Sequence, residues 1–292
     1  MSAPTPSATG YAIVVVSAVA FAGNNVFSAL SYEGGTTPLA LITVRMALTL
    51  GVLVLLSAAF GLPMRLARQD RFAALGLGLL NGAMAFCLMS AFEHVAVGLA
   101  ILVFYIYPAL TAFGAWLIGQ ERLTRGLVIG LAGSFAGLAL ALEVEDLHAN
   151  VAGLAFAATA AVLLTFIGLI SNRVMRTAAP WPVTLHVHIS AVSMFVIASL
   201  VTGDFALPGN ERGWIGFATV PVVYTVAIVG FFVGIARIGA VRSSLLMNLE
   251  PVVSIALGFV ILGQALHPQQ LLGAAIVIAS ITALKLPAGR RN

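Results

Sequence analysis

Charged residues are scarce in this sequence of 292 residues. Asp, Glu, Lys and Arg together make up 8% of it, apolar residues make up 61%, and the mean hydropathy is +1.07. Soluble globular domains carry about 25% charged residues, so this chain lacks the polar surface that a water-soluble fold needs. The composition therefore excludes a soluble domain and predicts a protein that lies in a lipid bilayer.

Cysteine and the common catalytic motifs are also absent or nearly so. Cys87 is the only cysteine, which excludes an intrachain disulfide. The sequence contains no phosphate-binding G-x-x-x-x-G-K-[ST] loop, no H-E-x-x-H and no G-x-S-x-G. His186 and His188 are separated by one residue, a spacing at which helical side chains do not face each other. We therefore expect no ATP hydrolysis, no intramembrane enzyme, no metal site and no cofactor.

Long apolar runs dominate the rest of the sequence. A helix of about 20 apolar residues crosses a bilayer, and ten stretches are long enough. Their approximate bounds are 10–31, 38–60, 72–92, 96–118, 124–143, 151–171, 182–203, 214–235, 242–262 and 268–286. The first run follows no positively charged signal region, so it is expected to remain as a span. Because a lipid-exposed backbone must satisfy its hydrogen bonds within its own segment, the sequence predicts an all-α integral membrane protein with ten transmembrane helices.

The cations alternate with the spans. Twelve of the 14 Lys and Arg residues lie in every second connecting segment: Arg65, Arg68, Arg71, Arg122, Arg125, Arg173, Arg176, Arg237, Arg242, Lys285, Arg290 and Arg291. The segments between carry one cation, Arg212, and seven acids: Glu33, Glu93, Glu143, Glu145, Asp146, Asp204 and Glu211. Cytoplasmic loops collect Lys and Arg, so both termini are expected in the cytoplasm, with the chain in a bacterial inner membrane. Orientation accounts for the net charge of +4, and no nucleic-acid partner is expected.

The sequence repeats itself at a distance of 143 residues. Gly10 aligns with Gly153, Ser28 with Ser171, Pro108 with Pro251, Leu123 with Leu266 and Gly130 with Gly273. The interval predicts two units, 1–147 and 148–292, of five spans each. Because five is odd, the second unit enters the membrane from the opposite side. Inverted repeats of this kind are a transporter architecture with the substrate site near the midplane, where the halves meet.

These features carry a resemblance to a known family. The chain resembles the drug/metabolite transporter superfamily, EamA type, in the Pro-initiated fourth helix, the G-Q-E-R-L turn at 119–123, the small-residue fifth helix and S-S-L-L-M-N-L-E-P at 243–251. It departs from the pattern at Gln264, where the first unit has Glu121. The resemblance implies two five-helix EamA units. Size and the lack of a dedicated ion-binding motif are similar to bacterial metabolite exporters, including YddG-like aromatic amino acid exporters.

Arg45 and His188 occupy equivalent positions in the second span of each unit. Arg45 lies seven residues into its span, which is about 10 Å deep. A charged residue at this depth costs roughly 2.5–3.5 kcal/mol, so it is a candidate for binding a substrate carboxylate, with His188 lending a hydrogen bond or a proton. In the alternative interpretation, Arg45 extends to the interface and His188 only packs.

Glu250 is the carboxylate placed deepest in a span, directly before Pro251. It could bind a substrate ammonium group, carry a proton or pair with Arg45, or it could form a purely structural ion pair. A proline at this place frees a backbone carbonyl one turn earlier, as in the broken helices of transporters. In the first unit Tyr107 aligns with Glu250, and Tyr105 aligns with Asn248.

Other polar residues within the spans complete the candidate site. Asn81 aligns with Tyr224, and Asn24 and Asn25 lie in the middle of the first span near Phe21. A single Asn in a membrane helix often only bonds a neighbouring helix, for about 0.6 kcal/mol. Together, however, these side chains predict an apolar cavity with a few hydrogen-bonding points, which suits an amino acid better than a sugar phosphate.

Small residues mark the predicted fifth helix at Gly126, Gly130, Gly133 and Gly137. This spacing predicts close helix packing, either within one monomer or between subunits. The first four helices of each unit are expected to surround the cavity, with the fifth and tenth at its edge.

The sequence therefore predicts a transporter that exports small metabolites by alternating access. The resemblance implies amino acids as substrates, aromatic ones first. Efflux of cationic drugs or quaternary ammonium compounds is an alternative that would use Glu250 and leave Arg45 unfavourably placed. A second alternative is a membrane scaffold that transports nothing. The sequence leaves open the direction of transport, its coupling to protons and the oligomeric state.

Overall fold

A computed structural model describes residues 8–143 and 150–283. Within these residues the chain forms α-helices, a single π-helical segment and no strand. The elements are α1 (Ala8–Glu33), α2 (Pro38–Phe60), α3 (Arg68–Phe92), α4 (Val97–Phe104), α5 (Tyr107–Leu117), α6 (Arg125–Ala141), α7 (Val151–Val174), α8 (Pro180–Thr202), α9 (Glu211–Ile238), α10 (Ala240–Leu246), α11 (Leu249–Leu257), η1 (Gly258–Leu262) and α12 (Pro268–Ala283). Glu145, Asp146, Lys285, Arg290, Arg291 and the end of the predicted tenth span lie outside the described residues.

The elements form ten membrane crossings, as predicted. Among the described residues, eight segments are long and apolar enough to span a bilayer, and two of them, 97–117 and 240–262, combine consecutive helices. The remaining two crossings are the shorter apolar helices α6 and α12, of 17 and 16 residues. The α6 helix is shorter than the 124–143 stretch expected from the sequence, and α12 is described as far as Ala283. The prediction of an all-α integral membrane protein is confirmed.

Local sequence explains where several helices begin and end. Thr37, Thr124 and Asn210 cap α2, α6 and α9, and each side chain accepts a hydrogen bond from a backbone N–H of the first turn. Gly61 and Gly203 follow α2 and α8 in the left-handed conformation that glycine adopts without steric cost. These caps give the spans short, defined connections.

The fourth and ninth crossings are broken, whereas the sequence predicted continuous spans at 96–118 and 242–262. The first half ends at Phe104 or Leu246, and the second begins at Tyr107 or Leu249. Proline causes this difference, because it donates no hydrogen bond and collides with the carbonyl four residues earlier. Pro108 and Pro251 lie in the first turn of α5 and α11, so both breaks fall at nearly the same place in the repeat.

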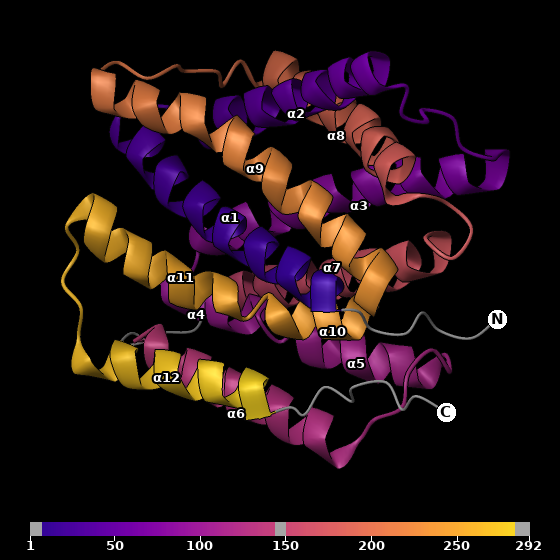
Figure 1. Cartoon of the computed structure of the whole chain (residues 1–292). Helices are drawn as coiled ribbons and strands as arrows, with labels where there is room; N and C mark the ends of the chain where they lie inside the picture. The colour runs from indigo at the N-terminus through magenta and orange to yellow at the C-terminus, as the bar shows by residue number, and fades with distance from the viewer. Residues whose placement is uncertain (1–7, 144–149, 284–292) are drawn as a thin grey trace.

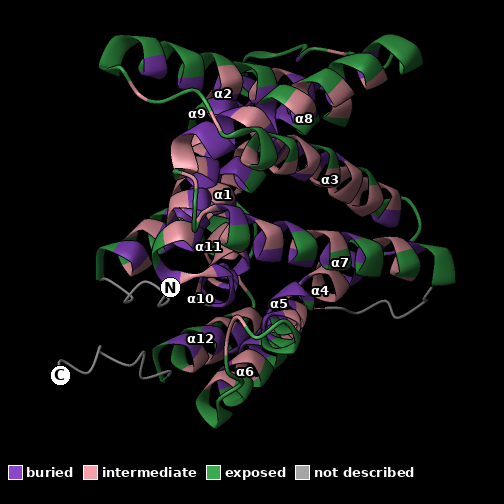
Figure 2. Ribbon diagram, turned by 90° about the vertical axis from the view of Figure 1, so that its right-hand side faces the viewer, coloured by how far each residue is buried: buried purple, intermediate pink, exposed green. Residues whose placement is uncertain are grey.

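The helices pack in pairs that link the two units (Figure 1). The α1 and α9 helices lie side by side through the middle of the molecule, α3 packs on α7 and α8, and α6 packs on α12. A side chain at Gly216 of α9 would meet the backbone oxygen of Phe27 in α1 at 2.5 Å, so this crossing depends on glycine. Figure 2 shows buried residues concentrated in α1 and α9 and exposed ones on the outer helices.

The α6–α12 pair forms the edge layer that the sequence predicted. At Gly137, an added Cβ would lie 2.8 Å from the backbone oxygen of Gly273, and at Gly133 it would meet Ser280. These two glycines therefore serve packing within one monomer. Gly126 faces open space.

The described arginines of the alternating pattern lie at one end of the molecule, which we call the arginine-rich end. It comprises the α2–α3, α5–α6, α7–α8 and α9–α10 connections, on the right-hand side of Figure 1. The start of α1 and the end of α12 lie at the same end. Glu33, Glu93, Asp204 and Glu211 lie at the other end, called here the opposite end.

Candidate functional site

A series of three hydrogen bonds joins Arg45 to Glu250. Arg45 of α2 donates from Nη1 to Asn24 Oδ1 over 3.1 Å. Asn24 donates from Nδ2 to Asn25 Oδ1 over 3.2 Å, and Asn25 donates from Nδ2 to Glu250 Oε1 over 2.8 Å. The direct ion pair considered from the sequence is not formed between these residues, because the two asparagines of α1 lie between the charges. We call these four residues the polar series.

The Arg45 end of the polar series rests on an aromatic ring. The Arg45 guanidinium carbon lies 4.6 Å from the centroid of the Tyr224 ring in α9, a cation–π contact. Tyr224 is buried and packs edge-on against Phe21, with ring centroids 6.0 Å apart. Arg45 Nε is buried and has no hydrogen-bond partner among the described residues. The guanidinium therefore keeps an unused donor.

His188 contacts the same tyrosine from α8. Its ring centroid lies 6.0 Å from that of Tyr224, and its Nδ1 lies 2.8 Å from the carbonyl oxygen of Thr184. An Nδ1 that donates to this carbonyl leaves Nε2 as an acceptor, and Nε2 is buried without a partner in the described part of the chain. The equivalent positions 45 and 188 thus meet at one ring.

The two helix breaks lie at the Glu250 end of the polar series. The Tyr105 side chain is within hydrogen-bonding reach of the Glu250 carboxylate. Phe104, Tyr105 and Tyr107 form an aromatic cluster with ring centroids 5.5–5.8 Å apart. Asn248, in the ninth crossing, is 4% exposed, and its Oδ1 lacks a partner among the described residues. The proline-induced breaks therefore place an aromatic surface beside one carboxylate, and the break in the ninth crossing also holds an unused acceptor.

Two residues differ from their predicted importance. Asn81 lies half-buried in α3, and its side chain makes no hydrogen bond to the described residues. Asn25, which the sequence analysis named beside Asn24 without a role of its own, is exposed and forms the link to Glu250. Its polar side chain in the middle of an apolar span was the signal in the sequence.

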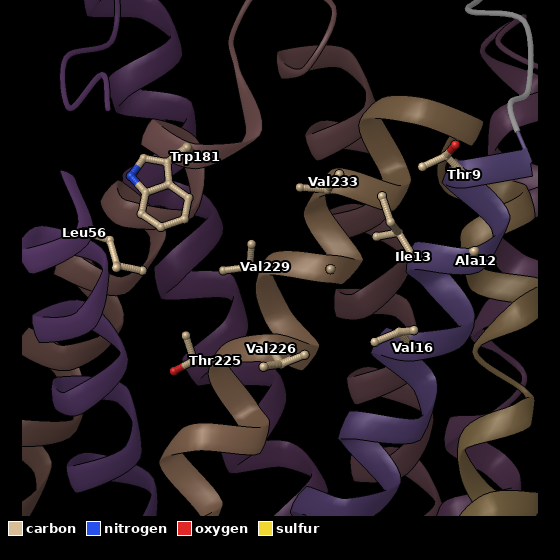
Figure 3. Close-up of a pocket in the computed structure, with 11 residues that line it drawn as sticks. Thr9, Ala12, Ile13, Val16, Leu56, Trp181, Thr225, Val226, Val229 and Val233 are labelled. Carbon is tan, nitrogen blue, oxygen red and sulfur yellow. The ribbon is translucent and has the colours of Figure 1, made fainter. Parts of the chain in front are cut away.

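An apolar groove lies apart from the polar series (Figure 3). It has a volume of about 500 Å³ and is lined by α1, α2, α8 and α9, with Ile13, Val229 and Trp181 among its walls. Thr225 of α9 lines this groove. The equivalent residue of the first unit is Gly82 of α3, which packs directly on Met194 of α8. No charged side chain lines this groove, so it offers nothing to hold a charged metabolite.

Comparison with known proteins identifies the family. The EamA-like transporter family matches residues 8–142 and again residues 151–285, which together cover almost the whole described chain. The chain belongs to the EamA-like transporter family. It is therefore a multi-pass membrane transporter with two EamA units, each of which contributes five of the crossings described above.

Individual EamA relatives are distant. The chain is 25% identical over 190 residues to the uncharacterized transporter YyaM of Bacillus subtilis (strain 168), covering 62% of this chain and 61% of that protein. The match thus spans about three fifths of that relative. The chain is 24% identical over 240 residues to the threonine/homoserine exporter RhtA of Escherichia coli (strain K12), covering 80% of this chain and 77% of that one. A solved crystal structure at 18% identity shares the fold, with a TM-score of 0.82 over 95% of this chain and 98% of that one.

Proposed function

We propose that this EamA transporter exports amino acids by alternating access, with Arg45 attracting the substrate carboxylate and Glu250 its ammonium group. The observation that carries the proposal is the polar series. It holds one cation and one carboxylate in the same network within the spans, without pairing them directly. A zwitterionic amino acid offers a carboxylate to Arg45 and an ammonium group to Glu250.

The energetics of the membrane support a binding role for both charges. Charged groups within a span are costly, and they usually pair with one another or mark a substrate path. Here each of the two charges bonds an asparagine amide, and Arg45 retains a buried, unused Nε donor. Asn24 and Asn25 neutralise neither charge, so both remain available to ionic groups of a substrate.

The aromatic residues at both ends of the polar series favour apolar and aromatic amino acids. Tyr224 and Phe21 lie beside Arg45, and the cluster of Phe104, Tyr105 and Tyr107 lies beside Glu250. RhtA, by its name, exports threonine and homoserine, so amino acid export also has a precedent among the relatives. We propose to compare these substrates, the apolar and aromatic amino acids and threonine, as competitors in one assay.

The placement in the membrane is part of this proposal. Because Lys and Arg collect in cytoplasmic loops, the arginine-rich end faces the cytoplasm of a bacterium, with both termini there. The units 1–147 and 148–292 then form the two inverted halves, and the polar series that links Arg45 to Glu250 lies where the halves join, as in other inverted-repeat transporters.

Uptake of labelled phenylalanine into proteoliposomes tests the proposal. We expect flux above that of empty liposomes, suppressed by excess unlabelled tryptophan, methionine or threonine and not by a cationic dye. Arg45→Gln and Glu250→Gln should each abolish most of this flux. Arg212→Gln is the matched control, because Arg212 is an exposed cation in the first turn of α9, outside the polar series.

Two outcomes would overturn the proposal. Suppression by the cationic dye, with Glu250→Gln inactive and Arg45→Gln fully active, would establish cationic efflux instead. Absence of flux for every amino acid and dye from a folded protein would favour a scaffold.

A further inference from the structure

The two ends of the molecule are closed to different degrees. The α10 helix lies at the arginine-rich end and buries Ala240, Val241, Ser243, Ser244, Leu245 and Leu246. Its counterpart in the repeat, α4, lies toward the opposite end and buries Leu99 and Ala100 alone. The α10 helix packs on α5 and α7, whereas the equivalent contacts of α4 with α11 and α1 are slight or absent. The arginine-rich end is therefore the closed one.

Polar bonds join the two units at this closed end. Arg242 of α10 forms an ion pair with Glu121 of the α5–α6 connection, with Nη1 and Oε1 3.0 Å apart. Beside it, Asn172 of α7 donates from Nδ2 to Gln120 Oε1 over 2.6 Å. Arg242 also donates to the carbonyl oxygen of Ile238 over 3.3 Å. Each of the two side-chain contacts connects the first unit to the second.

The opposite end is joined differently. His267 and Glu143 form an ion pair there, and the positions equivalent to the four residues above cannot form the same bonds. At a distance of 143 residues, Arg242 aligns with Leu99 and Glu121 with Gln264. Asn172 aligns with Ala29, and Gln120 with Gly263. All four partners are replaced by residues that cannot form either contact. The asymmetry of the two ends is thus present in the amino-acid sequence.

We propose that the Glu121–Arg242 pair is a latch that holds the arginine-rich end shut while the opposite end is open, and that this end opens only when the pair separates. Alternating access moves one repeat against the other around a fixed site, so a pair that has no counterpart at the equivalent positions of the opposite end must bias the equilibrium between the two states. The inference rests on transporter membership and is independent of the substrate.

Distances between spin labels at the two ends test the latch without any substrate. In a Cys87→Ser background, which removes the single cysteine, one label pair replaces Arg122 and Arg237 beside the latch. A second pair replaces Ala96 and Ala265 at the opposite end. All four residues are exposed, and positions 122 and 265 are equivalent in the repeat.

We expect Arg242→Gln to increase the population of long 122–237 distances at least two-fold and to shorten the 96–265 distances in the same sample. The charge exchange Glu121→Arg with Arg242→Glu should restore the distribution of the unsubstituted protein, because the pair can form again. Arg176→Gln is the control, since it removes an exposed cation from the same end. It should leave both distances unchanged.

Unchanged distances at both ends in Arg242→Gln would overturn the proposal. A longer 122–237 distance without a shorter 96–265 distance would also overturn it, because that result shows local loosening and no gate. If Arg242→Gln does not fold, Glu121→Gln breaks the same pair and is read by the same criteria.

Discussion

The helices α4 and α10 occupy the same place in the two repeats and are nonetheless buried very differently. Six residues of α10 are buried, whereas α4 buries only two. Both helices are short halves of a crossing that a proline breaks, so length does not separate them. The difference follows Arg242 and Glu121, whose counterparts are Leu99 and Gln264. A repeat therefore fixes the architecture, while a few unmatched residues decide which end closes.

The centre of the molecule shows the same kind of asymmetry. Arg45 aligns with His188, and Glu250 aligns with Tyr107. In each pair one residue belongs to the polar series and the other packs beside an aromatic ring. The proposed binding charges thus come one from each unit. The site is therefore positive at one end and negative at the other, which a symmetric pair would not allow.

The largest effect is expected from removing either binding charge. A hydrogen bond to a charged group contributes roughly 1.5–3 kcal/mol, and 1.4 kcal/mol corresponds to about ten-fold. Arg45→Gln and Glu250→Gln should therefore lower amino acid transport about ten-fold or more. The counterpart changes His188→Gln and Tyr107→Phe should lower it much less. Initial rates in proteoliposomes, normalised to inserted protein, measure the difference. Equal losses of transport at both members of a pair would contradict the asymmetry between the two units.

Installing the missing latch at the opposite end should reverse the closure. Leu99→Arg with Gln264→Glu places a cation and a carboxylate at the positions equivalent to Arg242 and Glu121. The 96–265 label distance should then shorten and the 122–237 distance lengthen. Leu99→Arg alone is the control, and it should not produce this pattern because it lacks the partner. If the double variant keeps the original distances, residues other than this pair set the closure.

A smaller effect on stability is expected where α1 and α9 cross. A side chain at Gly216 would collide with backbone atoms of Phe27 and Ser31 at 2.5 and 2.7 Å, and overpacking costs roughly 1–3 kcal/mol. Gly216→Leu should therefore lower the unfolding temperature in detergent. Ala73→Leu, at the equivalent and half-buried position of α3, should lower it less. An equal loss at both positions would show that the two crossings are equally tight.

The smallest effect is expected at Asn81. Its side chain makes no hydrogen bond to the described residues, so Asn81→Leu should change transport less than about two-fold. Tyr224→Leu, at the aligned position, removes the ring under Arg45, a contact worth about 0.5–2 kcal/mol. Transport rates of the two variants should differ several-fold. A strong loss of transport in Asn81→Leu would show that Asn81 belongs to the binding site.

The number of crossings and the repeat follow from sequence because the bilayer permits so few backbone structures. Apolar runs in lipid can only be helices, and an interval of 143 residues with shared glycines and prolines marks the two units. The breaks in the fourth and ninth crossings were harder to predict from the sequence. Pro251 signalled a freed carbonyl, but the place at which each helix stops depends on its neighbours.

The candidate site could be predicted only as a collection of polar residues. Depth in a span selected Arg45 and Glu250, but the bridging role of Asn25 depends on how α1 is rotated against α11. The same dependence left Asn81 outside the polar series. Hydrophobicity and spacing do not determine helix rotation, because nearly every face of these helices is apolar.

Competition by phenylalanine analogues tests the central claim most directly, since each analogue lacks one charge. Phenethylamine lacks the carboxylate, and 3-phenylpropanoate lacks the ammonium group. If Arg45 and Glu250 each bind one charge of a zwitterion, unlabelled phenylalanine should suppress the flux of labelled phenylalanine, while equal concentrations of either analogue should suppress it at least ten-fold less. Suppression by phenethylamine as strong as that by phenylalanine would contradict the account, because it would show that Arg45 does not bind the carboxylate.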